Sequence, residues 1–447
     1  MCIRDRYGRM KKKSLFSSKG ATDAVVDENV EKKGSFLEKL NQPLFSSKKK
    51  EVNQDESEYF FDAEEKAPEK FMSKLNQPLF TKKTKEAKAP AIMANQPYTM
   101  FGKPIKGNLL AIDFDDESVH LVLARQKRKT IEVINSVSTA LPENVVYQGD
   151  IVDAVVLEDI ISSLISQYNL SAKYAFFALN NNHIIARSVD VVSSVQSDED
   201  IQGLVAFELQ QYLDIDPTSY VIQYQELNEK QDPDAETRSL MVYAVPEMVV
   251  EKYLTLAENL KLVPYVFDLQ SNSFEKWLDQ VQAINNQAKR MREQNIGIVH
   301  LSKTAIEVYL YSEGKFVTSN YHDGGYEMIL NVADDSSILQ KLSLLATNDL
   351  DTSAIKQALD SWLDDARNHI LNTENFFTSS TGYIIDTFYV YGDQDVCWQL
   401  ASILKNKLGR DFVSIDSVDC ENIVWEGTTE FSAEYIPATA MLIRRSN

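Results

Sequence analysis

Three consecutive acidic residues follow the first strongly apolar segment of the chain, residues 109–112. They belong to a turn, residues 113–118, that reads Asp113, Phe114, Asp115, Asp116, Glu117 and Ser118. A turn at the end of such a strand offers backbone N–H groups that can bind phosphate. Each carboxylate facing a phosphate charge at ~4–6 Å costs roughly 3–4 kcal/mol, more than the roughly 1.5–3 kcal/mol that one N–H contact to a charge returns. This first turn therefore has the position of a phosphate loop but the wrong charge for one.

The same acids raise the alternative of a divalent-cation site, because carboxylate oxygens are the ligands that Mg²⁺ and Ca²⁺ prefer. Their spacing lacks the full ligand set of a calcium loop, so we favour a solvated acidic turn and predict no metal. The five histidines form no His-Glu-x-x-His pattern, and the sequence holds neither a Gly-x-Ser-x-Gly elbow nor a Walker loop. No catalytic residue is predicted.

Composition restricts the class of protein. The chain has 447 residues, 44% of them hydrophobic, enough for two or three domains with real cores. Three scattered cysteines indicate a reducing compartment, and neither a signal peptide nor a transmembrane run is expected, which together predict a cytoplasmic protein. Residues 1–107 carry a net charge of +7 and the remainder carries −27. An acidic body of this kind argues against nucleic-acid binding.

Residues 1–107 are predicted to be a disordered tail that contains a repeated motif. Phe-Leu-Glu-Lys-Leu-Asn-Gln-Pro-Leu-Phe at 36–45 recurs as Phe-Met-Ser-Lys-Leu-Asn-Gln-Pro-Leu-Phe at 71–80. A segment this short cannot bury its apolar groups alone. We interpret it as a tandem linear motif that orders on a partner, with neutral duplication as the alternative. The candidate partner-binding residues are Phe36, Leu40, Leu44, Phe45, Phe71, Leu75, Leu79 and Phe80.

The folded body, from residue 108 onward, has the pattern of a two-lobed α/β protein. The first lobe is expected at 108–295 and the second at 296–447. An α+β subdomain at about 186–245 is expected to be inserted in the first lobe, opening with a helix N-terminus at 197–200. Strands are predicted at 109–114, 118–125, 130–138, 174–179, 184–192, 220–227, 239–245, 263–269, 296–301, 306–311, 316–321, 386–391 and 412–415. Helices are predicted at 155–168, 198–213, 247–260, 276–295, 335–347, 351–372, 394–408 and 435–445.

Each lobe opens with a strand meander followed by helices and strands, and this duplicated plan resembles the actin-like (ribonuclease H-like) ATPase superfamily. Within that superfamily it is similar to the PilM family of type IV pilus assembly proteins, which is related to the cell-division protein FtsA. The segments that carry the likeness keep the family's order and spacing over residues 108–445. They are residues 110–113 with 118–122, 141–146 with 149–153, 198–215, 242–246, 263–268 and 323–325.

The resemblance implies a nucleotide site formed by Asp113, Asp115, Ser118, Ser302, Gly324, Gly325 and Gly392. In this chain every element of that site departs from the family pattern. The glycine of the first turn is Asp115, the metal-binding aspartate of the second is His300, and only Gly392 remains of the glycines under the adenosine. We expect a pseudo-ATPase that binds neither ATP nor Mg²⁺.

What the resemblance implies about function is a scaffold at the cytoplasmic face of the membrane, in a type IV pilus or a related secretion or competence platform. A groove between the first lobe and its inserted subdomain is expected to take the short N-terminal peptide of a PilN-like membrane protein. The tail repeats are expected to recruit a second partner or further copies of the chain. A nucleotide-driven switch is one alternative. An FtsA-like division protein is another, although the closing helix at 435–445 leaves little chain for a membrane helix of the FtsA type.

Overall fold

A computed structural model of the chain describes a defined set of residues: 99–100, 103–104, 106–127, 130–195, 197–213, 216–227, 237–288, 290–332, 353–426 and 431–444. The repeated motif at 36–45 and 71–80 and the helix expected at 335–347 lie outside these residues. Within the segment predicted as a tail, β1 (Thr99–Met100) and β2 (Lys103–Pro104) form one short antiparallel pair.

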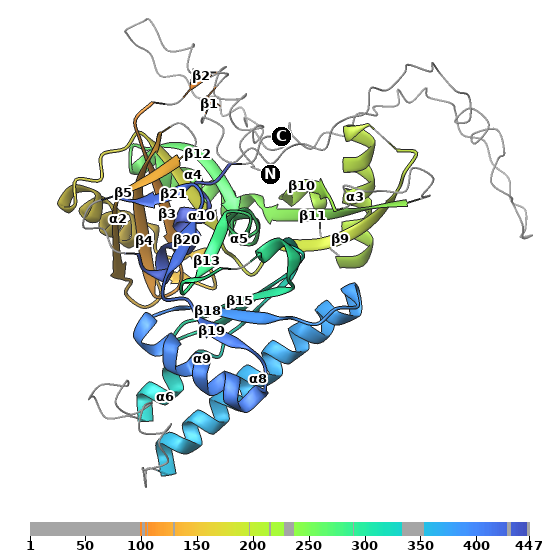
Figure 1. Cartoon of the computed structure of the whole chain (residues 1–447). Coiled ribbons are helices and arrows are strands. Elements are labelled where there is room, and N and C mark those ends of the chain that lie inside the picture. Colours follow the sequence, from red (N-terminus) through yellow and green to blue (C-terminus); the bar gives the residue numbers. More distant parts are fainter. Residues whose placement is uncertain are drawn as a thin grey trace, which may run out of the picture. The chain divides into compact units, whose positions relative to one another are not determined.

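A six-stranded sheet forms the first half of the fold (Figure 1). In spatial order its strands are β12 (Val263–Leu269), β8 (Tyr174–Leu179), β3 (Asn108–Phe114), β4 (Ser118–Lys127), β5 (Thr130–Ala140) and β21 (Ile423–Trp425). β3, β4 and β5 make the predicted meander, while β8 and β12 run parallel to β3. The central strands are almost uniformly apolar because helices cover both faces of the sheet.

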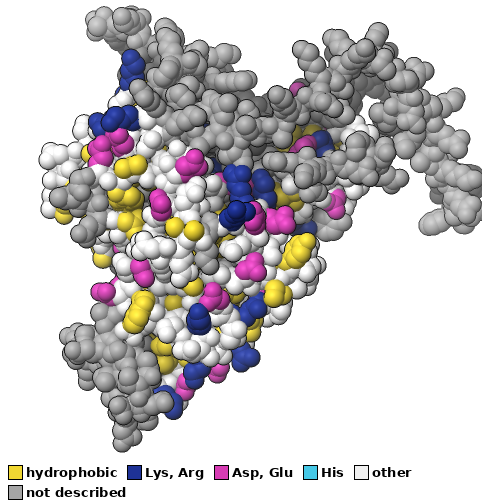
Figure 2. Space-filling model, in the orientation of Figure 1, with side chains coloured by type: hydrophobic (Ala, Val, Ile, Leu, Met, Phe, Trp, Pro, Cys, Tyr) yellow, Lys and Arg dark blue, Asp and Glu magenta, His cyan; other side chains and the backbone are white. Residues whose placement is uncertain are grey.

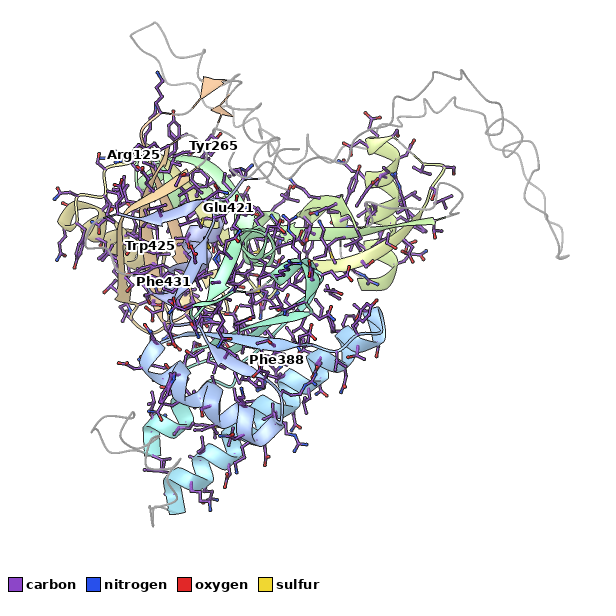
Figure 3. The ribbon with its side chains drawn as sticks, in the orientation of Figure 1. Arg125, Tyr265, Phe388, Glu421, Trp425 and Phe431 are labelled. Atoms are coloured by element: carbon purple, nitrogen blue, oxygen red, sulfur yellow. The ribbon has the colours of Figure 1, made fainter. Side chains whose placement is uncertain are left out.

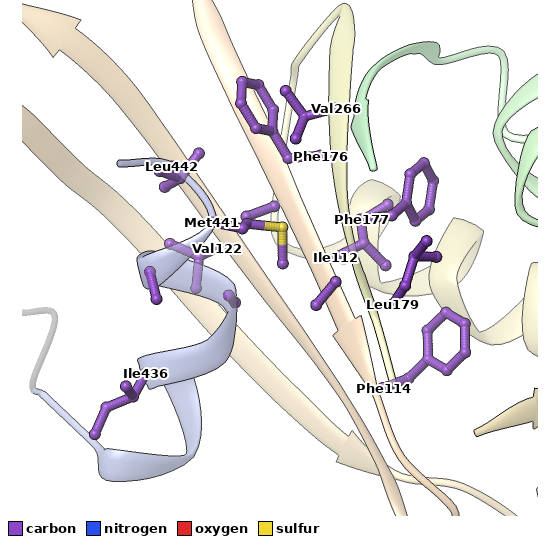
Figure 4. Close-up of a cluster of buried hydrophobic side chains, with 14 of the residues drawn as sticks. Ile112, Phe114, Val122, Phe176, Phe177, Leu179, Val266, Ile436, Met441 and Leu442 are labelled. Carbon is purple, nitrogen blue, oxygen red and sulfur yellow. The ribbon is translucent and has the colours of Figure 1, made fainter. Parts of the chain in front are cut away.

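The two faces of this sheet pack against different helices. Phe114 stacks on Tyr253 of α4 (Glu247–Asn259) with ring centroids 5.2 Å apart, and α2 (Ala154–Gln167) packs beside α4. Ala111 lies three positions before Phe114 on β3, so its side chain points to the face opposite that of Phe114. Val122 of β4 pairs with Ala111 and therefore points to the same face as Ala111. There it meets the C-terminal segment, whose Met441 and Leu442 lie beside it in Figure 4.

The inserted element forms a separate small layer. β9 (Ile185–Val192), β10 (Tyr220–Glu226) and β11 (Thr237–Pro246) make a three-stranded antiparallel sheet, with α3 (Asp198–Leu213) on one side and η3 (Pro217–Ser219) before β10. Its own apolar cluster includes Val205 and Leu240. The predicted helix start is confirmed, because Ser197 Oγ accepts the Asp200 N–H at 3.1 Å. A two-residue pair, β6 (Val146–Tyr147) with β7 (Asp150–Ile151), precedes α2.

A second sheet has the order β17-β16-β15-β18-β19. Its strands are β15 (Ile296–Leu301), β16 (Ile306–Ser312), β17 (Lys315–His322), β18 (Thr387–Gly392) and β19 (Phe412–Ser414). The same half of the chain contains three helices, α6 (Glu327–Val332), α8 (Ser353–Thr381) and α9 (Gln394–Leu408). The meander, β18 and α9 lie where the sequence pattern predicted them, and α8 continues beyond the predicted end at residue 372.

Residues 276–295 do not form the predicted polar helix. α5 (Gln270–Leu278) ends early and is followed by β13 (Val281–Ile284), β14 (Gln287–Ala288) and η4 (Met291–Glu293). Asn285 and Asn286 have φ of 50° and 60° and form the two-residue turn between β13 and β14. Asparagine tolerates this left-handed backbone. The prediction was wrong because the spacing of the polar residues was interpreted as helical, whereas the adjacent Asn285 and Asn286 indicate a hairpin turn.

The predicted closing helix at 435–445 is also wrong in extent. η5 (Ala433–Tyr435) leads into α10 (Ile436–Ala440), which ends after five residues. Beyond it, Lys276 Nζ donates to the carbonyl oxygen of Ile443 at 2.8 Å. Before this segment, β20 (Val418–Cys420) pairs with β13, and β21 joins the edge of the first sheet. There Trp425 and Phe431 pack edge to face at 5.7 Å (Figure 3).

None of the helices in the described part of the chain is long and apolar enough to span a bilayer. On the face seen in Figure 2, acidic and basic side chains are interspersed, without a continuous basic patch.

Candidate functional site

The turn between β3 and β4 and the turn after β15 face each other across a cavity of about 330 Å³. We call the first (residues 113–118) the first turn, the second (residues 300–305) the second turn, and the space the cleft cavity. Of the residues that the sequence predicted for a nucleotide site, five line this cavity and two do not. The five are Asp113, Asp115, Ser118, Ser302 and Gly392, and the two are Gly324 and Gly325.

Asp115 uses its carboxylate on the backbone of its own turn. Its Oδ1 accepts the N–H groups of Glu117 and Ser118 at 2.8 Å each, and the Ser118 hydroxyl at 3.2 Å. These two N–H groups are the donors that a phosphate turn would offer to its ligand. The carboxylate that replaces the family's glycine therefore occupies the acceptor position of a phosphate oxygen.

Asp116 and Glu117 hold neighbouring loops in the same manner. The Asp116 carboxylate accepts the N–H groups of Gln148 and Gly149, at 2.8 and 3.1 Å. The Glu117 Oε1 accepts the N–H of Thr304 at 2.7 Å and its hydroxyl at 3.1 Å. The first turn was expected to be solvated. Instead, each of the three adjacent carboxylates, at positions 115–117, binds N–H groups of the chain itself, which explains how three consecutive acids are tolerated.

His300 supplies a positive charge at the floor of the cleft cavity. Its ring stacks on Tyr391 with centroids 4.6 Å apart, its Nδ1 lies 3.3 Å from Glu307 Oε1, and its Nε2 lies 3.8 Å from Asp115 Oδ2. Burial opposes a charge on the ring, but the hydrogen bond and charge of Glu307, with Asp115 nearby, outweigh it and raise the pKa of His300 to about 9. An imidazolium thus stands where the family pattern has a metal-binding carboxylate.

Asp113 is almost fully buried at the start of the first turn, with 5% of its surface exposed. Burial, reinforced by the charge of Asp115, raises the pKa of Asp113 well above its ordinary range and favours the neutral carboxylic acid. Within the described residues, no group of three or more metal-ligating side chains comes together.

The glycines predicted for the site serve the backbone rather than a ligand. Gly325 N donates to Thr304 O at 2.9 Å, and a Cβ on Gly325 would lie 2.2 Å from the Lys303 carbonyl oxygen. Gly392, with φ of 141°, approaches Leu301 O so closely that a Cβ would lie 2.3 Å away. Both glycines let neighbouring segments pack behind the second turn. Gly324 lies beside the ion pair of His322 with Asp365, away from the cleft cavity.

Sequence reasoning missed two acids on the far wall of the cleft cavity, Asp393 and Glu434. Burial, with the charges of Asp393 and Asp115, raises the pKa of Glu434 to about 6. Glu434 belongs to the C-terminal segment, and no local sequence pattern indicates that this segment returns to the first turn. The described wall of the cavity includes one lysine, Lys303, and no arginine.

A second cavity of about 370 Å³ adjoins the first one, and its wall includes six amide side chains. We call it the amide pocket. Its wall combines the first sheet, Ile184 and Ala186 at the start of the inserted sheet, and residues 319–321 of β17. The Nδ2 of Asn181, a side chain that is 5% exposed, has no hydrogen-bond partner among the described atoms. The amides that line the pocket are Gln148, Asn180, Asn181, Asn182, Gln270 and Asn320.

Comparison with known families agrees with this architecture. The family model described as Type IV pilus assembly protein PilM matches residues 111–420. The chain belongs to the PilM family. The resemblance predicted from the sequence is thereby confirmed, as is the actin-like fold with its two sheets.

Several solved structures are similar to this chain at low sequence identity. A chain of a PilM-PilN type IV pilus biogenesis complex has a TM-score of 0.59 at 17% identity, covering 75% of this chain and 98% of its own length. An ethanolamine utilization protein, EutJ from Carboxydothermus hydrogenoformans, gives 0.39 at 9% identity, covering 75% of this chain and 89% of its own. A Bacteroides thetaiotaomicron protein with an actin-like ATPase fold gives 0.36 at 11%, covering 70% and 91%. No curated protein matches the chain.

Proposed function

We propose that this PilM-family chain is a nucleotide-independent scaffold of a type IV pilus assembly platform. It binds a short cytoplasmic peptide of a PilN-like membrane protein and is held at the cytoplasmic face of the membrane through that partner. The chain of a PilM-PilN complex shares its fold, and the family model covers most of its body.

One observation carries the nucleotide-independent part of the proposal. The Asp115 carboxylate accepts the N–H groups of Glu117 and Ser118 at 2.8 Å each. A nucleotide would have to displace this carboxylate from two charge-assisted hydrogen bonds and then lie beside it. His300 occupies the position at which the family pattern has a metal-binding aspartate, so the carboxylate that would hold the metal between phosphate and protein is missing there. Both changes act against the same ligand, so we assign the cleft cavity no nucleotide and the chain no ATPase activity.

The amide pocket is the candidate peptide site. Its wall combines residues of the first sheet and the turns beside it with residues of the second sheet, and Ile184 and Ala186 add the start of the inserted sheet. This wall offers amide donors and acceptors suited to a peptide backbone. Asn181 Nδ2 is buried and has no hydrogen-bond partner among the described atoms. The described wall carries the acids Asp115, Asp116 and Glu307 and no Lys or Arg, which favours a neutral or basic segment over an acidic one.

A blocking variant tests the peptide site. Ser319 is an exposed residue of β17 on the pocket wall, so Ser319→Trp fills the pocket without disturbing the core. Ser380→Trp, on an exposed face of α8, is the matched control. We expect the N-terminal peptide of the cognate PilN-like protein to bind the full chain and the control, measured by fluorescence anisotropy, and to bind Ser319→Trp at least tenfold more weakly. Equal affinity in all three proteins would show that the peptide binds elsewhere.

Isothermal titration of the full chain with Mg-ATP tests the other part of the proposal. We expect no heat of binding at millimolar nucleotide. Micromolar affinity would favour the second candidate function, a nucleotide-driven switch, for which the cleft cavity between the two turns offers the space.

The repeated tail motif supports a second binding function, which we propose separately. Two copies of one apolar motif in a single chain give avidity for a partner with two sites, or for a second copy of this chain. Exchange of Leu40, Phe45, Leu75 and Phe80 for serine is expected to abolish capture of that partner while leaving PilN-peptide binding intact. Loss of both activities together would contradict the separation of tail and body.

A further inference from the structure

We propose that Glu117 is a built-in clamp that holds the first and second turns together without a nucleotide and thereby keeps the amide pocket in its binding shape. The clamp joins residues 187 positions apart in the chain. Its carboxylate bridges the gap between the two turns directly. The pocket half of this proposal rests on the peptide-binding function proposed above, whereas the clamp itself does not.

The bridge is well defined at both ends. Glu117 Oε1 accepts both the backbone N–H of Thr304, at 2.7 Å, and its hydroxyl, at 3.1 Å. Glu117 is fixed in turn, since its N–H donates to Asp115 and its carbonyl oxygen accepts the Leu141 N–H at 2.6 Å. The Glu117 carboxylate thus accepts two charge-assisted hydrogen bonds from one residue, one of them from the backbone, and these restrain the distance between the turns more strongly than a single bond between two mobile side chains.

A second set of contacts crosses between the sheets directly below the clamp. Asn180, after β8, donates through Nδ2 to Glu307 Oε2 at 2.8 Å, and the Tyr309 hydroxyl lies within hydrogen-bond distance of two acceptors, Glu307 Oε2 at 2.6 Å and Asn180 Oδ1 at 3.2 Å. His300 completes this layer through Glu307 and Asp115. Buried polar groups of this kind are satisfied only while the two sheets keep their separation.

The clamp and the amide pocket share a wall. Thr304, Glu307 and Tyr309 line the pocket, as do Asp115 and Asp116 of the first turn. If the turns separated, these residues would move relative to Asn181 and Ala186 on the opposite wall. A pocket that is already formed binds the peptide without the free-energy cost of closing. The population of the clamped state therefore sets the apparent affinity for the peptide. Glu117 is therefore a positioning residue for the partner and does not touch it.

Hydrogen exchange on the full chain tests the clamp without any partner. In Glu117→Ala, the Thr304 N–H loses its acceptor, and we expect its exchange to become roughly tenfold to hundredfold faster. Amides in the middle of β15 should be unchanged, which shows that the protein is still folded. Glu117→Gln retains an acceptor oxygen and should recover most of the protection. Glu143→Ala, an exposed acid in the loop after β5, is the control and should change nothing.

The partner peptide tests the coupling. We expect Glu117→Ala to bind the cognate PilN-like N-terminal peptide about tenfold more weakly than wild type, and Glu117→Gln to bind nearly as well as wild type. Unchanged exchange at Thr304 in Glu117→Ala overturns the clamp. Faster exchange with unchanged peptide affinity overturns the coupling to the pocket. If the wild-type chain binds no peptide, the proposed function fails, and the exchange result still decides the clamp.

Discussion

His300 and Glu307 form a buried pair on neighbouring strands, with His300 Nδ1 lying 3.3 Å from Glu307 Oε1. The two residues face each other directly in the pairing of β15 with β16, so their distance follows from strand register. Tyr391 stacks on one side of the imidazole, and Asp115 approaches its other nitrogen. A charged histidine is therefore a fixed structural part of this cleft.

This pair makes stability depend on pH in a definite direction. The pKa of His300 is raised from an ordinary value near 6.5 to about 9. Below pH 6.5 both folded and unfolded chains hold the proton, and the stabilisation is complete. Between pH 6.5 and 9 only the folded chain holds it, so the contribution falls as pH rises and is lost above about 9. The acids that face the ring are Asp113, Asp115, Glu117 and Glu307.

We expect His300→Gln to remove this pH dependence. One pKa unit corresponds to about 1.4 kcal/mol, so wild type should lose a few kcal/mol of unfolding free energy from this group between pH 6.5 and 9. Urea unfolding at both pH values measures the difference. His183→Gln changes an exposed histidine and should keep the wild-type slope. A slope that persists in His300→Gln would assign the effect to another group.

Removing the Asp115 carboxylate should make the first turn more receptive to anions. Asp115→Gly frees the N–H groups of Glu117 and Ser118 and deletes one negative charge. We expect Mg-ATP to give measurable heat on titration into this variant and none on titration into wild type. Glu143→Gln removes one exposed acid elsewhere and should not change nucleotide binding. A variant that stays folded by circular dichroism and still binds nothing would mean that the remaining acids suffice to exclude the ligand.

The buried pair of Lys276 with Asp268 should dominate the stability of the region around α5. Both side chains are almost fully buried, and Lys276 Nζ also donates to Ile443 O at 2.8 Å. Lys276→Met leaves Asp268 buried without its cation, and we expect a loss of about 3–5 kcal/mol in the free energy of unfolding. Lys127→Met removes an exposed partner of Glu132 and should cost less than about 1 kcal/mol. Denaturant midpoints at constant m-value distinguish the two.

Two glycine-to-alanine changes are expected to act in opposite directions. Gly149 has φ of 72°, and a Cβ there would lie 1.6 Å from Asn180 O on the wall of the amide pocket. Gly149→Ala should destabilise the chain and weaken peptide binding together. Gly203 lies in α3 with no atom near its Cβ position, so Gly203→Ala should stabilise the helix by about 0.5–1 kcal/mol. Thermal melting of both variants, with peptide titration, checks the contrast.

Much of the architecture could be predicted from periodicity. Apolar runs such as 174–179 and 263–269 are strands with the predicted bounds, and α3 and α9 begin and end where their patterns do. These elements have strong local signals, because a strand buried on both faces must be continuously apolar and a helix needs its capping residues. Prediction failed at α5 and α10, whose residues are buried almost throughout. Buried polar pairs such as Lys276 with Asp268 place charged residues in the core, so buried and exposed positions no longer differ in polarity, and the sequence pattern depends on that difference.

The sequence by itself determined which side chains occupy the first turn, and their charge alone argued against a phosphate ligand. It also determined the family, through the order of its motifs. Only the tertiary structure decided how that turn is used. Asp115 binds its own N–H groups, and Glu117 reaches Thr304 from 187 positions away. Sequence patterns report local periodicity. A hydrogen bond between two turns forms only after the two sheets have packed around α5 and the C-terminal segment has returned to the first sheet.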